Sequence, residues 1–149
     1  MILFCVGLVA LIFFTDYRIK NHIEEEYVEG EIREIFGGKL LIRKHHNKGA
    51  MLNLGQSKRK VVAALSVVLT IITLLVFMIS FGKRGNTMMR VGLSFLLGGA
   101  FSNTYDRLKR KYVVDYVSFP VKWERLRNVV FNLADFCIMI GALCSLLAG

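Results

Sequence analysis

Residues Val61 to Phe81 read VVAALSVVLTIITLLVFMISF, an uninterrupted apolar run dense in Val, Leu and Ile. A helix of about 20 apolar residues crosses the hydrocarbon core of a bilayer, and this run has that length. Over the 149 residues of the chain, 54% are hydrophobic and one is Pro, which is too apolar for an ordinary soluble domain. The sequence therefore predicts an integral membrane protein with a span at this run.

Three further apolar runs lie outward from this stretch. The first, 1–15, is slightly short for a span, but it lacks the charged start and the small-residue cleavage site of a removable signal peptide. The other two each carry a polar patch near one end. We predict an all-α polytopic membrane protein, a single domain over 1–149, with four transmembrane helices at approximately 1–15, 61–81, 88–104 and 129–148.

The charged segment 16–60 contains a hairpin signal. Two short strand-like runs between Glu31 and Arg43 flank the pair Gly37-Gly38, a combination typical of a tight β-turn. We expect a small β-hairpin cradle here, after the first helix.

Between the third and fourth helices, 107–128 mixes Trp and Tyr with Lys and Arg, which predicts an interfacial segment at headgroup depth.

Two polar constellations of the same form adjoin the third and fourth spans. They read Asn103-Thr104-Tyr105-Asp106 and Asn132-Leu133-Ala134-Asp135, and Asp115 lies between them. On a helix, residues three apart share a face, so each Asn and Asp pair can point at one polar pocket. A carboxylate at the edge of hydrocarbon costs several kcal/mol unless it is paired, neutralised or wetted, so these acids indicate a functional site.

Two neighbouring carboxylates cannot both ionise cheaply, so one keeps a proton and the other remains a base. Such a pair can hydrolyse a peptide bond with an activated water and no metal, and we predict no cofactor. The residues alone pair Asp106 with Asp135, because the two motifs mirror each other. The alternative is purely structural: Asn and Asp at this spacing also cap helix N-termini.

The net charge is +9, from 20 Lys and Arg against 11 Asp and Glu. On a membrane protein this excess favours anionic lipid headgroups as partners. Nucleic acid is not expected, because the chain has neither zinc-finger spacing nor a basic helix interleaved with stacking aromatics.

Five ordered motifs resemble the signature blocks of the lipoprotein signal peptidase family, signal peptidase II. Three of them contain the polar residues described above, one follows the first apolar run, and one lies later in the charged segment 16–60. In chain order they are Asp16-Tyr-Arg-Ile-Lys20, Asn47-Lys-Gly49-Ala-Met51, Gly98-Gly-Ala-Phe-Ser-Asn-Thr-Tyr-Asp-Arg107, Tyr112-Val-Val-Asp-Tyr116 and Phe131-Asn-Leu-Ala-Asp135. The resemblance covers nearly the whole chain and keeps order and spacing.

This resemblance implies a four-helix bacterial aspartyl endopeptidase with a β-rich cradle. Its substrates are prolipoproteins with a diacylglyceryl-modified lipobox Cys, from which it removes the signal peptide, and cyclic peptides inhibit the family. The implied catalytic pair is Asp115 and Asp135, so Asp106 becomes a supporting residue. The implied substrate-binding and supporting residues are Asn47, Gly49, Asn103, Asp106, Arg107 and Asn132.

The chain departs from the family pattern at two places. Ser102 stands where the family usually has Gly, and Met51-Leu52 stands where Ala-Phe is usual. We expect Ser102 to narrow the pocket or alter the helix spacing.

An alternative function is a catalytically inactive membrane adaptor of the same fold that binds lipopeptides. A proton-coupled transporter is disfavoured, because four short spans without an inverted repeat do not suit transport.

The resemblance implies a multi-pass protein of the bacterial inner membrane whose site faces the extracytoplasmic side. The charge pattern gives the opposite orientation. Of the 20 Lys and Arg, 10 lie in 16–60, 7 in 104–128 and 3 in the short second loop. The positive-inside rule would put the first and third loops in the cytoplasm. We follow the family, because its motifs are more specific than a charge count.

Overall fold

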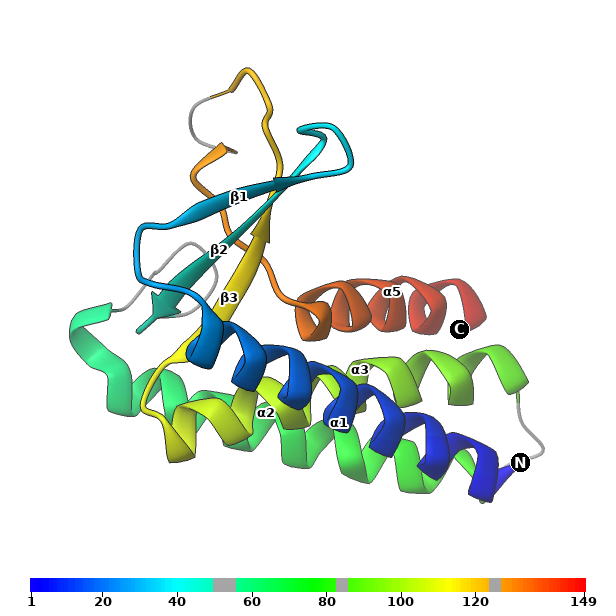
Figure 1. Ribbon diagram of the computed structural model, residues 1–149. Coiled ribbons are helices and arrows are strands. Elements are labelled where there is room, and N and C mark those ends of the chain that lie inside the picture. Colours follow the sequence, from blue (N-terminus) through cyan, green and yellow to red (C-terminus); the bar gives the residue numbers. More distant parts are fainter. Residues whose placement is uncertain (50–55, 83–85, 124–126) are drawn as a thin grey trace.

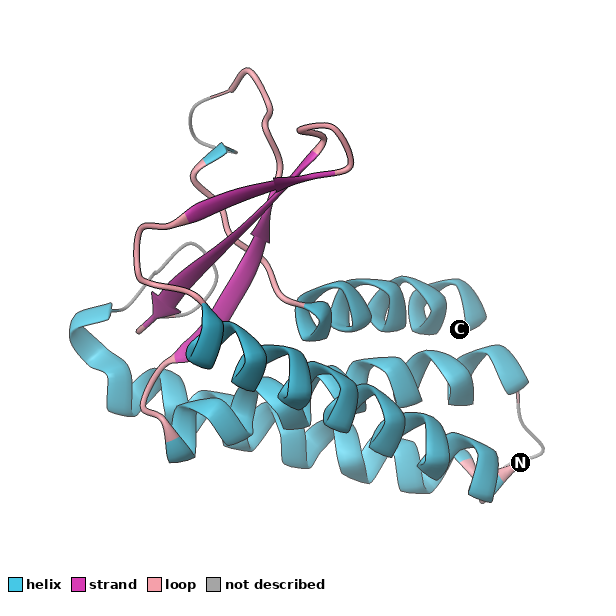
Figure 2. Ribbon diagram, in the orientation of Figure 1, coloured by secondary structure: helices cyan, strands magenta, loops and turns pink. Residues whose placement is uncertain are grey.

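The computed structural model describes residues 1–49, 56–82, 86–123 and 127–149. In these ranges four long helices run side by side, a small sheet lies at one end of them, and both termini lie at the other end (Figure 1). Figure 2 shows the same division between helical bundle and sheet. In chain order the elements are α1 (Ile2–Glu26), β1 (Ile32–Ile35), β2 (Leu40–Asn47), the 3-10 helix η2 (Gln56–Lys58), α2 (Arg59–Ser80), α3 (Thr87–Lys109), β3 (Val113–Ser118) and α5 (Leu133–Ala148).

Within the described ranges, α1 and α2 are the two helices long and apolar enough to cross a membrane, and α5 is a shorter apolar helix. Helix α2 buries only Thr70 and Phe77. Its other large apolar side chains, such as Leu69 and Ile79, stay exposed along the helix. An exposed apolar surface of this extent is what a lipid-facing helix requires, because water would make it a site of aggregation.

Helix α3 is the central element and packs against α1, α2 and α5. Glycines make its closest approach to α5 possible. A Cβ at Gly99 would overlap the carbonyl oxygen of Ala134, and a Cβ at Gly141 would overlap the backbone of α3 at Leu96. Small residues at such crossings let helix backbones come together.

The predicted hairpin is present: β1 and β2 pair antiparallel, from Ile32 opposite Arg43 to Ile35 opposite Leu40. The turn contains Gly37 and Gly38 with φ of 66° and 80°, a conformation that suits glycine.

A third strand, however, extends the sheet to the order β1-β2-β3, so the chain is mostly helical rather than all-α. Val113–Ser118, within the segment that the sequence predicts to be interfacial, form this largely buried strand, and the depth of the segment in the membrane stays a prediction. Trp123, beyond it, is 75% exposed. Pairing between β2 and β3 joins residues far apart in the chain, which no local pattern signals.

Strand β3 has two different faces. Val113 and Asp115 line a cavity against the helices. Val114 and Tyr116, on the alternate face, pack with Ile23 of α1 in a small hydrophobic core. Successive side chains of a strand point to opposite faces, so the strand connects the sheet to α1 and presents a carboxylate to the cavity.

Helix α1 runs to Glu26 and thus continues past the predicted end of the first span at residue 15. Asp16 and Lys20, expected after this helix, lie inside it and are fully buried. The predicted cradle segment 16–60 therefore begins with a helical stretch, and the sheet starts at Ile32.

Candidate active site

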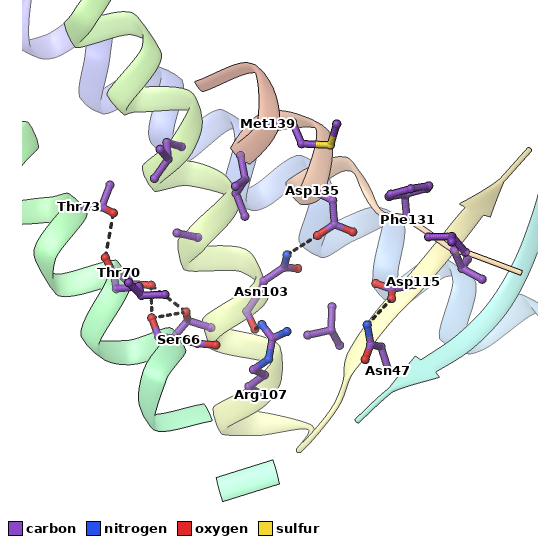
Figure 3. Close-up of a pocket in the computed structure, with 18 residues that line it drawn as sticks. Asn47, Ser66, Thr70, Thr73, Asn103, Arg107, Asp115, Phe131, Asp135 and Met139 are labelled. Carbon is purple, nitrogen blue, oxygen red and sulfur yellow. Dashed lines mark hydrogen bonds between the residues drawn. The ribbon is translucent and has the colours of Figure 1, made fainter. Parts of the chain in front are cut away.

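A cavity of about 420 Å³ lies where the sheet meets α2, α3 and the start of α5 (Figure 3). Most of its wall is apolar, Asn47 and Asp115 line it on the side of the sheet, and Ser66, Thr70 and Thr73 add hydroxyl groups on α2. The residues predicted from the sequence that line it are Asn47, Asn103, Arg107, Asp115 and Asp135.

Asp115 enters the cavity from β3 and is 2% exposed. Asn47 Nδ2 donates a hydrogen bond to its Oδ2 at 3.0 Å, and Asn132 Nδ2 donates to its Oδ1 at 2.7 Å. Burial, together with the negative charge of Asp135, raises the pKa of Asp115 from 3.8 to about 7 despite these donors. The carboxyl can therefore gain or lose a proton near neutral pH.

Asp135 lies in the first turn of α5, where Asn132 is the N-cap. Asn132 Oδ1 accepts a hydrogen bond from the backbone N–H of Asp135 at 2.8 Å, and the backbone N–H of Asn132 donates to Asp135 Oδ2 at 3.1 Å. This reciprocal pair is a capping box, so the helix cap that the spacing also predicts is present at this motif. Since Asp135 also lines the cavity, the cap and the site use the same residues.

Asn132 contacts both carboxylates, through its side chain to Asp115 and its backbone to Asp135. Asn103 adds a second donor, since its Nδ2 lies 2.8 Å from Asp135 Oδ1. Lys20 Nζ donates to Asn103 Oδ1 at 2.9 Å, and this contact fixes which way the amide faces. The two acids come from elements separated in the chain, and a shared set of amides holds them around one cavity.

Arg107 lines the cavity, and Gly49, which does not line it, supports the residues that do. Arg107 donates hydrogen bonds to the carbonyl oxygens of Gly49 at 3.2 Å and Asn103 at 3.4 Å. The backbone N–H of Gly49 donates to Asn47 Oδ1 at 3.0 Å, which turns the amide nitrogen of Asn47 toward Asp115. The buried Nε of Arg107 has no hydrogen-bond partner among the residues that the structure describes.

Asp106 does not line the cavity, so the prediction that pairs it with Asp135 is wrong. Its carboxylate forms ion pairs with Lys20 at 3.1 Å and Arg110 at 2.9 Å, and it accepts a hydrogen bond from the backbone N–H of Val114 at 3.2 Å. These contacts connect α3 to α1 and β3, in agreement with the supporting role that the resemblance implies.

Asp16 and Lys20, which have no predicted role in the site, form a buried ion pair at 2.7 Å. The sequence feature that could have predicted this ion pair is an acid and a base four residues apart at the end of an apolar helix. Ser102 does not narrow the pocket, because it does not line the cavity and its hydroxyl lies between these two residues; the alternative, an altered helix spacing, stays a prediction. The departure at Met51-Leu52 lies outside the described residues.

In the described ranges, no group of three or more His, Cys, Asp or Glu side chains is placed to hold a metal ion. The chemistry that the site itself offers is proton transfer. Neighbouring carboxylates favour a state in which one carries a proton and the other does not, and in that state one can take a proton from water while the other gives one to a carbonyl oxygen.

Comparison with known proteins gives a consistent result. A family model described as "Signal peptidase (SPase) II" matches residues 8–149. The chain is 31% identical to a lipoprotein signal peptidase of Caldicellulosiruptor bescii, over 88% of this chain and 80% of that protein. It is 31% identical to one of Moorella thermoacetica, over 91% and 85%.

A solved structure described as a bacterial membrane enzyme matches with a TM-score of 0.84 at 26% identity. The match covers 99% of this chain and 88% of that one. The prediction of a membrane protein is confirmed by this likeness together with the apolar helices.

Proposed function

Because this chain belongs to the signal peptidase II family, we propose that it is an aspartic endopeptidase in which Asp115 and Asp135 activate a water molecule. The chain removes signal peptides from prolipoproteins, the activity of this family, and the inactive adaptor is not favoured. One observation supports the aspartic mechanism: carboxylates from β3 and α5 line a single cavity and both accept hydrogen bonds from Asn132.

In the proposed reaction, the ionised member of the pair takes a proton from water as the water oxygen attacks the peptide carbonyl carbon. The protonated member gives its proton to the carbonyl oxygen, and the tetrahedral intermediate then collapses as the amine leaves with a proton. Three amide side chains, Asn47, Asn103 and Asn132, hold the acids in place. The Nε of Arg107, which has no partner among the described residues, is a further donor for the substrate backbone.

The cavity wall suits a lipid-modified substrate. Its apolar lining includes Leu69 of α2, Leu96 of α3, and Ile138 and Met139 of α5. We propose that the acyl chains and the apolar signal peptide lie along this wall while the bond before a diacylglyceryl-modified lipobox Cys reaches the acids. The cyclic peptide inhibitors of the family would compete for the same space.

The proposed membrane topology has four spans, formed by α1, α2, α3 and α5, in one domain. It agrees with the position of both termini at the end opposite the sheet (Figure 1). We propose that the sheet and the site face the extracytoplasmic side of the bacterial inner membrane, where exported precursors arrive, and that the basic residues there contact anionic headgroups. A reporter fused between α2 and α3 should then report the cytoplasm, and an external signal would reverse the orientation.

The function is tested with Asp115→Asn and Asp135→Asn proteins and a lipidated precursor peptide. Each change keeps the shape of the side chain and removes its proton transfer, so we expect turnover to fall by about 10²- to 10⁴-fold. Glu34→Gln, the same kind of change on the exposed strand β1, should leave turnover unchanged. Full cleavage by either Asp variant would refute the mechanism, and a wild-type protein that binds the precursor without cleaving it would support the adaptor.

A further inference from the structure

A buried ion cluster lies directly behind the cavity, between α1 and α3. Lys20 Nζ is 2.7 Å from Asp16 Oδ2 and 3.1 Å from Asp106 Oδ2, and the side chains of the two α1 residues are 0% exposed. The proposed mechanism uses none of these charges. In many proteins the desolvation free energy of buried ions is as large as the free energy gained from their pairing, so stability alone does not account for such a cluster.

Two hydroxyl groups complete the hydrogen bonding of Asp16. The Tyr116 hydroxyl donates to Oδ1 at 2.9 Å, and the Ser102 hydroxyl donates to Oδ2 at 2.5 Å. Ser102 also accepts a hydrogen bond from Lys20 Nζ at 3.1 Å. Burial and the nearby Asp16 charge raise the pKa of Tyr116, so its hydroxyl keeps its proton and remains a donor.

Each hydroxyl group is also connected to the cavity. Tyr116 Oη accepts a hydrogen bond from the backbone N–H of Leu133 at 2.9 Å, and Leu133 is the first residue of α5. On the other side, Lys20 Nζ donates to Ser102 and to Asn103 Oδ1, and Asn103 Nδ2 donates to Asp135. The cluster thus reaches Asp135 by two routes, through the start of its helix and through the amide beside it.

We propose that Tyr116 and Ser102 are positioning residues: through Asp16 and Lys20 they fix the start of α5 and the direction of the Asn103 amide, and so hold Asp135 toward Asp115. The inference rests on the proposed function, because it assumes that these two acids react together. It adds two residues that do not line the cavity, and it gives the unusual Ser102 a role. Misplacing a reacting group by about 1 Å can cost about 100-fold in rate, so small shifts of α5 matter.

The test compares Tyr116→Phe and Ser102→Ala with matched controls, each of which removes the hydroxyl group of another Tyr or Ser. Tyr17→Phe alters a ring that stacks on other aromatic residues, and Ser94→Ala alters a buried hydroxyl of α3 that bonds only its own helix among the contacts described. Active sites are counted by titration with a cyclic peptide inhibitor of the family, so that misfolded protein does not enter the rate. Per active site, we expect kcat to fall about tenfold in both test variants with KM unchanged, and no change in the controls.

The pH profile separates positioning from a purely structural role. The negative charge of Asp135 is one cause of the raised pKa of Asp115, so moving Asp135 away lowers that pKa. The alkaline limb of kcat against pH should therefore move to lower pH in Tyr116→Phe and Ser102→Ala. An unchanged kcat and an unchanged limb, per active site, in either variant would overturn the proposal. If Asp135→Asn itself cleaves at full rate, the proposed function has failed; if it is inactive while the hydroxyl variants match wild type, the positioning inference alone has failed.

Discussion

Replacing Asn132 separates the two roles that this residue combines. Its side-chain oxygen caps α5, and its side-chain nitrogen donates to the Asp115 carboxylate at 2.7 Å. Ser is also a good N-cap but has no amide nitrogen to reach Asp115, whereas Ala lacks both groups. The pair Asn132→Ser and Asn132→Ala therefore removes the two contributions one at a time.

The structure sets the size of each loss. A lost N-cap costs about 1 kcal/mol of stability. A lost hydrogen bond to a charged group costs about 1.5–3 kcal/mol, and this one is buried with its residue at 0% exposure. At pH 8, where Asp115 is mostly ionised, Asn132→Ala should lose about 2.5–4 kcal/mol and Asn132→Ser about 1 kcal/mol less. At pH 5 Asp115 is protonated, and the loss from the missing donor should be smaller.

Unfolding in detergent micelles and cleavage of a lipidated precursor measure the two effects. Both variants should lose activity to a similar degree, because both lack the donor to Asp115. Since the hydrogen bond from Asn132 lowers the pKa of Asp115, its loss should move the alkaline limb of the activity profile to higher pH. An Asn132→Ser protein with the wild-type rate and profile would refute the idea that this amide orders the acids. If Asn132→Ser and Asn132→Ala were equally stable, the N-cap would make no contribution to the stability of the protein.

Three further predictions follow from buried groups and close contacts. The pKa of Asp115 is about 7 in the folded protein against an ordinary value of 3.8, so folding takes up a proton between these two pH values and the free energy of unfolding falls as pH rises from about 4 to about 7. Asp115→Asn should therefore be more stable than wild type at pH 8, although it is inactive. The gain in stability should be smaller at pH 5. Gly99→Ala should lower stability by about 1–3 kcal/mol through overlap with the Ala134 carbonyl, whereas Gly7→Ala, with open space around it, should not. Activity should survive treatment with EDTA, because the proposed water activation uses carboxylates alone, and loss of cleavage restored by a divalent metal would refute that mechanism.

The fourth-helix motif shows how a local pattern can carry two roles. The Asn and Asp of this motif are three residues apart, and that spacing predicts both a helix cap and a polar pocket. The structure shows the cap and places Asp135 on the cavity wall. The mirrored motif in α3 behaves differently, because Asp106 turns to Lys20 and Arg110 while Asn103 faces the cavity. Three residues advance a helix by about 300°, so they differ by about 60° in direction, and a central helix with neighbours on several sides can send them to different partners.

The sequence by itself determined the elements whose signal is local. A long apolar run is enough to predict α2, and two glycines between short strand-like runs are enough for the hairpin, because length, period and turn geometry depend on neighbouring residues only. The tertiary structure decided which polar side chains come together across the chain. Asp115 and Asn47 are 68 residues apart and come together through the pairing of β2 with β3, while Asp16 reaches Tyr116 across 100 residues. Such contacts depend on how whole elements pack, and no local run of residues carries that information.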